Sequence, residues 1–168
     1  MSLITDIMEV VKKKTCIVGM GNYLRKDDAV GLYVVDELQG TVHSEKVLLL
    51  NVEDVIENYV FKIADLDCDN VLIIDAVRAT TTPGSIVFGR LTKCDEILDD
   101  YSTHKLSLAM CGKILEECGK KTYLLGVEAR DTDFGRGLSE DVQRSADILK
   151  DIIVEIIGSN NNEYVYKQ

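Results

Sequence analysis

The segment GMGNYLRKDDAVG, residues 19–31, constrains the fold of this chain more than any other feature. It follows the apolar run Cys16–Val18 and precedes an amphipathic stretch, Ala29–Leu38. This order predicts a strand, a glycine-rich turn and a helix. The turn ends in two adjacent carboxylates, Asp27 and Asp28, where a helix N-terminus would otherwise favour a bound anion. The segment is therefore a poor phosphate cradle and a candidate cation site.

The rest of the chain alternates apolar strands with helical patterns. Strands are expected at Thr15–Gly19, Lys46–Asn51, Asn70–Asp75, Ser85–Leu91 and Thr122–Val127. Helices are expected within residues 1–14 and at Asp28–Gln39, Val52–Ala64, His104–Cys118 and from Ser139 onward. Continuous apolar strands separated by helices indicate an α/β fold with a mostly parallel sheet covered on both faces. Only Ala76–Thr82 separates the third and fourth strands, which is too short for a helical crossover and predicts one antiparallel strand.

The chain has 168 residues, which predicts a single domain. We place that domain at residues 1–158, with residues 1–14 as an N-terminal helical extension and the polar residues 159–168 as a flexible C-terminal tail. The net charge of −10 argues against a nucleic-acid partner, because such partners require basic patches.

The sequence also bears on the compartment. No apolar run reaches the roughly 18 residues of a membrane span, and acidic residues interrupt the N-terminus where a signal peptide would be apolar. We therefore expect a cytoplasmic protein with no membrane partner. The five cysteines are odd in number and form no CxxC pair, so we expect reduced thiols.

Three residues with metal-binding side chains lie near the expected carboxyl ends of strands. Asp28 follows the first strand, Asp75 ends the third, and His104 opens a helix after a polar loop. Ligands of open α/β sheets bind outside these strand ends, so the three side chains are expected to converge. Two carboxylates and an imidazole suit a divalent metal such as nickel or zinc, and three protein ligands leave positions open for water or substrate.

Each of these residues also has an ordinary structural interpretation. Asp27, as a possible N-cap, and Asp28 lie at a helix start, where capping is worth about 1 kcal/mol. A histidine beside a helix N-terminus is common on surfaces. Asp75 is different, because a carboxylate that closes an apolar strand is costly unless it is solvated, paired or bound to a metal.

At these residues the chain resembles the maturation proteases of nickel–iron hydrogenases. The matching pieces are GMGNYLRKDDAVG, VLIIDA followed by Pro83-Gly84, STHKLSL, LLGVE and LSEDV. The resemblance spans Thr15 to about Gly158 and implies a three-layer α/β/α fold, phosphorylase/hydrolase-like, with a five-stranded mixed sheet. One departure is Ala129, where the family often has proline.

The resemblance also implies a function. The family removes the C-terminal extension from the precursor of a hydrogenase large subunit after nickel has been inserted. By position, the metal-contacting and catalytic residues are Asp28, Asp75 and His104, and the substrate-binding residues are Gly21, Asn22 and Asp27. Nickel is then supplied by the substrate, and the isolated protein is expected to hold metal weakly or not at all.

Three other functions compete with this interpretation. In a thiol or serine protease the nucleophile would be Cys111 or Ser107, but Cys111 lies two helical turns from His104, about 10 Å. In a nucleotide-binding module the turn would need a third glycine, and Leu24 stands there. A non-catalytic nickel-binding protein would keep the same three residues, and only an assay separates it from a protease.

Overall fold

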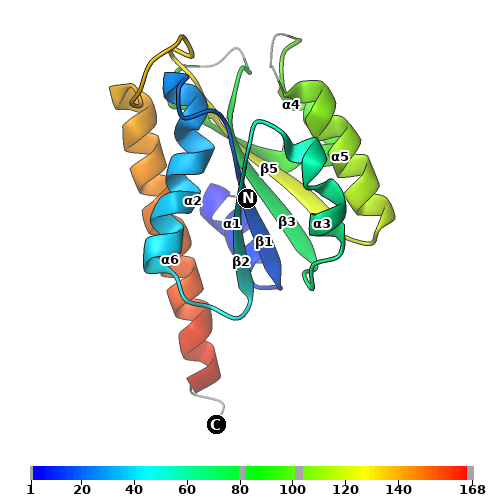
Figure 1. Cartoon of the computed structure of the whole chain (residues 1–168). Helices are drawn as coiled ribbons and strands as arrows, with labels where there is room; N and C mark the ends of the chain where they lie inside the picture. Colours follow the sequence, from blue (N-terminus) through cyan, green and yellow to red (C-terminus); the bar gives the residue numbers. More distant parts are fainter. Residues whose placement is uncertain (1, 80–81, 101–103, 166–168) are drawn as a thin grey trace.

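The computed structural model describes residues 2–79, 82–100 and 104–165 and shows a three-layer α/β/α architecture (Figure 1). The central sheet has five strands in the order β2-β1-β3-β5-β4. Their bounds are Thr15–Met20 (β1), Val47–Glu53 (β2), Asn70–Val77 (β3), Ile86–Arg90 (β4) and Lys121–Glu128 (β5). All neighbouring strands are parallel except β4 and β5, which are antiparallel. The predicted fold, with its single antiparallel strand, is confirmed.

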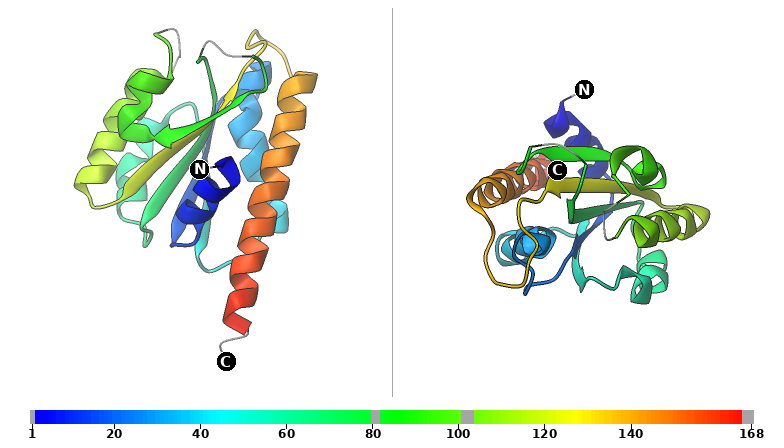
Figure 2. Two further views of the ribbon diagram at one scale, coloured as in Figure 1. Left: turned by 180° about the vertical axis from the view of Figure 1, so that it is seen from behind. Right: turned by 90° about the horizontal axis from the view of Figure 1, so that it is seen from above.

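Helices cover both faces of the sheet (Figure 2). One face carries α1 (Leu3–Val11), α2 (Val30–Thr41) and α6 (Glu140–Val165). The other carries α3 (Val60–Ala64), α4 (Cys94–Ile97) and α5 (Lys105–Glu117). Three short 3-10 helices complete the chain: η1 (Lys26–Ala29), η2 (Ile56–Asn58) and η3 (Leu91–Lys93). Each face has its own apolar core, because successive side chains of a strand point to opposite sides of the sheet.

The central strands β1 and β3 are buried and lie side by side, with Ile17 opposite Leu72 and Gly19 opposite Ile74. Burying each such aliphatic side chain is worth about 1.5–3 kcal/mol. Helix α2 packs closely on this pair at Gly31, where a Cβ atom would lie 2.0 Å from the carbonyl oxygen of Ile74. Only glycine permits this approach, which brings the turn before α2 against the carboxyl end of β3.

Several expected boundaries are wrong. The segment predicted as a helix at Val52–Ala64 begins as strand, since β2 continues to Glu53 before η2 and α3. Strand β2 is also a sheet edge, and its burial is incomplete, with Leu48 38% exposed. Although the sequence of β2 is apolar, its two faces are not both covered by packed helices. The expected loop Thr92–Thr103 contains the end of η3 and all of α4, and its residues 101–103 lie outside the described residues.

The chain ends also differ from expectation. Helix α6 continues to Val165, into the segment predicted as a flexible tail, because no proline follows Gly158 to end it; residues 166–168 are not described. Helix α2 likewise passes Gly40 and ends at Thr41. Helix α1 packs Ile7, Val10 and Val11 into the core.

All five thiols are free in the structure, and only Cys118 is exposed. Among the described residues, no helix is long and apolar enough to cross a membrane.

Candidate functional site

Three side chains from distant parts of the chain meet at the carboxyl edge of the sheet. Asp28 comes from η1, Asp75 from the last part of β3, and His104 from the residue before α5. One potential ligand atom from each residue lies within 4.8 Å of the others. The structure therefore brings together the three residues that the sequence singled out, and we call them the triad.

Asp75 and His104 form the closest pair in the triad. His104 Nδ1 lies 2.7 Å from Asp75 Oδ2, and the two side chains are 13% and 1% exposed. The other oxygen of Asp75, Oδ1, is buried and has no hydrogen-bond partner in the described part of the chain. A neutral imidazole that donates its Nδ1–H to Asp75 leaves Nε2 free to bind a cation.

Burial and the charges of neighbouring groups act in opposite directions on the pKa values of the triad. Burial raises the pKa of Asp75 and of Asp28, because it penalises their ionised forms. Burial lowers the pKa of His104, but the hydrogen bond that His104 donates to Asp75 and the charges of both carboxylates outweigh it and raise this pKa to about 9. A divalent cation would replace the imidazolium proton and give Asp75 Oδ1 a partner. The donor set of two oxygens and one nitrogen fits a borderline metal such as nickel.

The glycine turn holds Asp28 in place. Gly21 has a φ of +138°, and a Cβ atom there would lie 1.8 Å from the carbonyl oxygen of Asp28. Asn22 Oδ1 accepts a hydrogen bond of 2.9 Å from Leu24 N, which closes the turn. Gly21 and Asn22 also line a cavity of about 410 Å³ beside the triad. Their predicted contact with substrate is compatible with this position.

The cavity is also lined by a pair of acids that are not among the predicted site residues. Glu53 and Asp54, at the end of β2, line it together with Arg136 from the loop before α6. The negative charge of Asp54 also raises the pKa of both Asp28 and His104, so Asp54 interacts electrostatically with the triad. An acidic wall of this kind disfavours a phosphate ligand. The only sequence signal was the position of both acids just after an expected strand.

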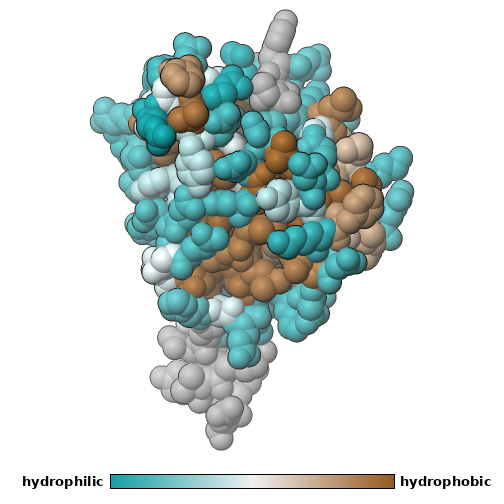
Figure 3. All heavy atoms as spheres, viewed as in Figure 1, coloured by the Kyte–Doolittle hydropathy of each residue, from teal (hydrophilic) through white to brown (hydrophobic). Residues whose placement is uncertain are grey.

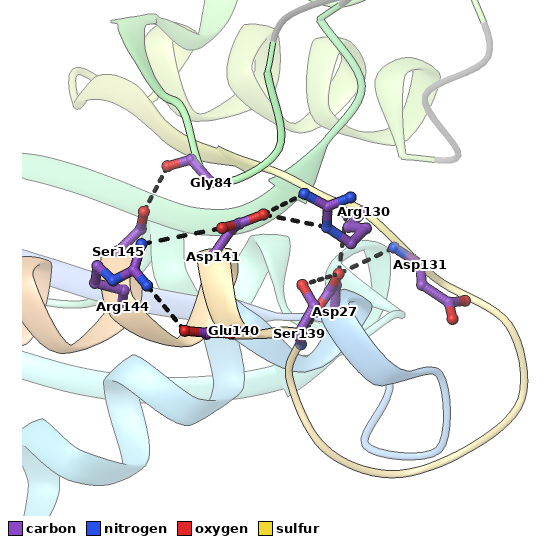
Figure 4. A network of polar contacts seen from close by, with 9 residues as sticks. All are labelled: Asp27, Gly84, Arg130, Asp131, Ser139, Glu140, Asp141, Arg144 and Ser145. Atoms are coloured by element: carbon purple, nitrogen blue, oxygen red, sulfur yellow. Dashed lines mark hydrogen bonds and ion pairs between the residues drawn. The ribbon is translucent and has the colours of Figure 1, made fainter.

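Asp27, the neighbour of Asp28, is fully buried and points toward Ser139 and Asp131 (Figure 4). Its Oδ1 accepts a hydrogen bond of 2.7 Å from Ser139 N. Its Oδ2 accepts three more, of 2.9 Å from Arg130 N, 3.0 Å from Asp131 N and 2.8 Å from the Ser139 hydroxyl. The hydrogen bonds of Asp27 thus hold the loop before α6 against the glycine turn.

These contacts change the interpretation of two residues. Asp27 was expected to cap its own helix and to bind substrate, yet its carboxylate is enclosed by main-chain groups and offers no surface to a substrate. We interpret it as a positioning residue. Ser139 does stand at the N-cap position of α6, but its hydroxyl donates to Asp27. The two residues lie 112 positions apart, and nothing in a single sequence links them.

The candidate nucleophiles are poorly placed for catalysis. Cys111 is fully buried, and burial raises the pKa of its thiol to about 11, which disfavours the reactive thiolate. The Ser107 hydroxyl is bound to the carboxylate of Glu57. These surroundings argue against covalent catalysis by either side chain.

Comparisons with known proteins show which family the chain resembles. A family model described as hydrogenase maturation protease (HycI) matches residues 32–156. A candidate hydrogenase maturation protease of Methanocaldococcus jannaschii is 32% identical over 154 residues, which cover 86% of this chain and 89% of the relative.

Solved structures extend the likeness. The crystal structure of a NiFe hydrogenase maturation protease, HycI, from Thermococcus kodakarensis KOD1 superposes with a TM-score of 0.80 and 31% identity, covering 91% of this chain and 99% of that chain. The hydrogenase maturating endopeptidase HybD from Escherichia coli shares the fold, with a TM-score of 0.71 and 21% identity over 89% of this chain and 93% of that chain.

Proposed function

Because the chain belongs to the hydrogenase maturation protease family, we propose that it removes the C-terminal extension from the precursor of a nickel–iron hydrogenase large subunit. The family makes the chain a hydrolase of peptide bonds. The finer proposal is that cleavage follows nickel insertion and that the nickel carried by the precursor is what the triad recognises. The observation that carries it is the buried Oδ1 of Asp75, which lies beside Asp28 and His104 and has no hydrogen-bond partner among the described residues.

In this proposal the triad residues have different tasks. Asp75 Oδ2 fixes the ring of His104, while Asp75 Oδ1 and His104 Nε2 face the arriving cation. A bound nickel ion supplies Lewis acidity, which polarises the scissile carbonyl or acidifies a water molecule. Asp28 is the more exposed carboxylate, at 5% against 1% for Asp75, and it has no part in the Asp75–His104 pair. We therefore assign to Asp28 the role of general base, which accepts a proton from the attacking water.

A cleavage assay on the precursor tests the proposal. Wild-type protein should shorten a nickel-loaded precursor and leave a nickel-free precursor intact. The variants Asp28→Ala, Asp75→Ala and His104→Ala should each lose cleavage, while Glu9→Ala, in an exposed position of α1, should keep it. Full activity in two of the three triad variants would reject the proposal. Binding of the loaded precursor without cleavage by the wild type would favour a non-catalytic nickel-binding protein.

A further inference from the structure

Strand β2 leaves one edge of the sheet open. It is the first strand in the sheet order, pairs only with β1 among the described residues, and has the sequence VLLLNVE. An edge strand presents a row of unpaired N–H and C=O groups, and proteins usually protect it with lysine, proline or a covering segment. Residues 47–53 contain neither lysine nor proline. Figure 3 shows an apolar area at this edge, between α2 and α3.

The opposite edge of the sheet is different. Strand β4 has five residues, all of them half-buried, against seven in β2. It packs against α4, and its last residue, Arg90, forms an ion pair with Glu116 at 2.5 Å. This edge is short and covered, in the usual manner of a protected edge. The exposure of β2 is therefore a local property of that strand.

The backbone of β2 indicates which groups face outward. Thr15 N donates to Lys46 O at 2.9 Å, and Thr15 is in register with Val47. In a parallel strand, the main-chain groups of alternate residues bond to the same neighbouring strand. The main-chain N–H and C=O groups of Leu48 and Leu50 therefore face β1, and the N–H of Leu49 faces the open edge. The strand offers about 23 Å of edge at about 3.3 Å per residue.

The carboxyl end of this edge runs into the candidate site. Glu53 ends β2, and it lines the 410 Å³ cavity together with Asp54, Gly21 and Asn22. Gly21 in turn lies against the main chain of Asp28. An extended peptide along β2 would therefore leave the strand at the cavity and reach the triad by turning across the carboxyl ends of β2 and β1.

We propose that the open edge of β2 binds an extended segment of the precursor as a sixth strand, which delivers the scissile bond to the triad. This inference rests on the proposed function, since it takes the precursor as the occupant. Main-chain hydrogen bonds would supply affinity with little sequence demand, and apolar side chains on either side of the segment would contact the borders of the two cores. The segment is thus expected to be extended, free of proline at bonding positions, and apolar.

Steady-state cleavage of nickel-loaded precursor tests this docking mode. Leu49→Pro removes the outward N–H, and Leu48→Lys places a charge on a side chain that is 38% exposed. Each should raise KM about tenfold, the equivalent of about one lost hydrogen bond, with kcat nearly unchanged. The matched control is Ile148→Lys, which is 50% exposed on α6, a helix that packs against α2 and β5, and its KM should equal that of the wild type. Wild-type KM in both Leu48→Lys and a folded Leu49→Pro would overturn the inference.

A photocrosslink gives an independent measurement if Leu49→Pro fails to fold. Benzophenone-alanine at position 48 should link to one short continuous segment of the precursor, and the same group at position 148 should not. Links from position 148 alone would overturn the inference, as would a concentration-dependent dimer that Leu48→Lys abolishes, because a second copy would then be the occupant. If wild-type protein cleaves the precursor and the edge variants behave normally, only this inference fails. If wild-type protein does not cleave, the proposed function fails.

Discussion

The Asp27 network and the triad both bury carboxylates at the same end of the sheet, and they begin at adjacent residues. The carboxylate of Asp27 accepts four hydrogen bonds from the loop before α6 and from Ser139. It also faces the N-terminus of α6, where the helix dipole favours negative charge. In the triad, Asp75 Oδ1 has no partner among the described residues, and the one internal source of positive charge is a protonated His104.

The difference separates a structural acid from a functional one. A buried carboxylate surrounded by N–H donors stabilises the fold, because those donors would otherwise lose their partners. A buried carboxylate with an orphan oxygen costs free energy that a cation can recover. Substitutions in the two clusters should therefore act on different quantities: stability at Asp27, and cleavage at the triad.

The largest expected effect is on catalysis at Asp75. In Asp75→Asn, the amide keeps the size of the side chain but loses the charge that binds a cation. Cleavage of nickel-loaded precursor should fall by about 1000-fold, a loss typical of removing a key electrostatic group. The free energy of unfolding should stay nearly equal, because the amide oxygen can still accept the hydrogen bond from His104 and the desolvation cost of the buried carboxylate offsets the lost charge interaction. Single-turnover cleavage and urea denaturation measure the two quantities.

A fall in both the cleavage rate and the free energy of unfolding would contradict the distinction between the two clusters, since the triad would then also stabilise the fold. Asp36→Asn serves as the matched control, because Asp36 is an acid outside the triad that pairs with Tyr23 and Asn51. Its cleavage rate should stay close to that of the wild type.

The next effect is on stability at Asp27. Asp27→Ala leaves buried N–H groups of Arg130, Asp131 and Ser139 without their acceptor, and the free energy of unfolding should fall by about 3 kcal/mol. Chemical denaturation measures the change. Lys26→Met is the matched control, because it removes the ion pair between Lys26 and Asp131. These two side chains are 33% and 39% exposed, so the free energy of unfolding should barely change. Equal losses in the two variants would contradict the special status of Asp27.

The sequence was sufficient to predict the sheet and the triad for a physical reason. The apolar runs of β1 and β3 mark buried central strands, and the carboxyl ends of parallel strands meet at one edge. Asp28 and Asp75 follow these runs directly, so their approach needs only the strand order. His104 was included because it opens a helix after a polar loop, and the family resemblance implied the same residue.

Other features depend on contacts that no local pattern encodes. Asp27 looked like a helix cap because its partners are more than 100 residues away. Strand β2 looked fully buried because its sequence is as apolar as that of β3, and only the sheet order reveals it as an edge. Helix α6 passes the polar residues after Gly158 because helical hydrogen bonds continue where no proline interrupts them.

The smallest expected effect concerns pH and sharpens the comparison further. A metal at the triad must displace the proton of His104, whose pKa is about 9. The apparent affinity for Ni²⁺ should therefore rise about tenfold per pH unit, or about 100-fold from pH 7 to pH 9, and level off above. Nickel titrations of concentrated protein, followed by NMR, measure this slope. Lys26→Met should keep it, because that residue belongs to the Asp27 side, and His104→Ala should flatten it. An unchanged slope in His104→Ala would show that another group carries the competing proton, and the contrast between the two clusters would lose its electrostatic basis.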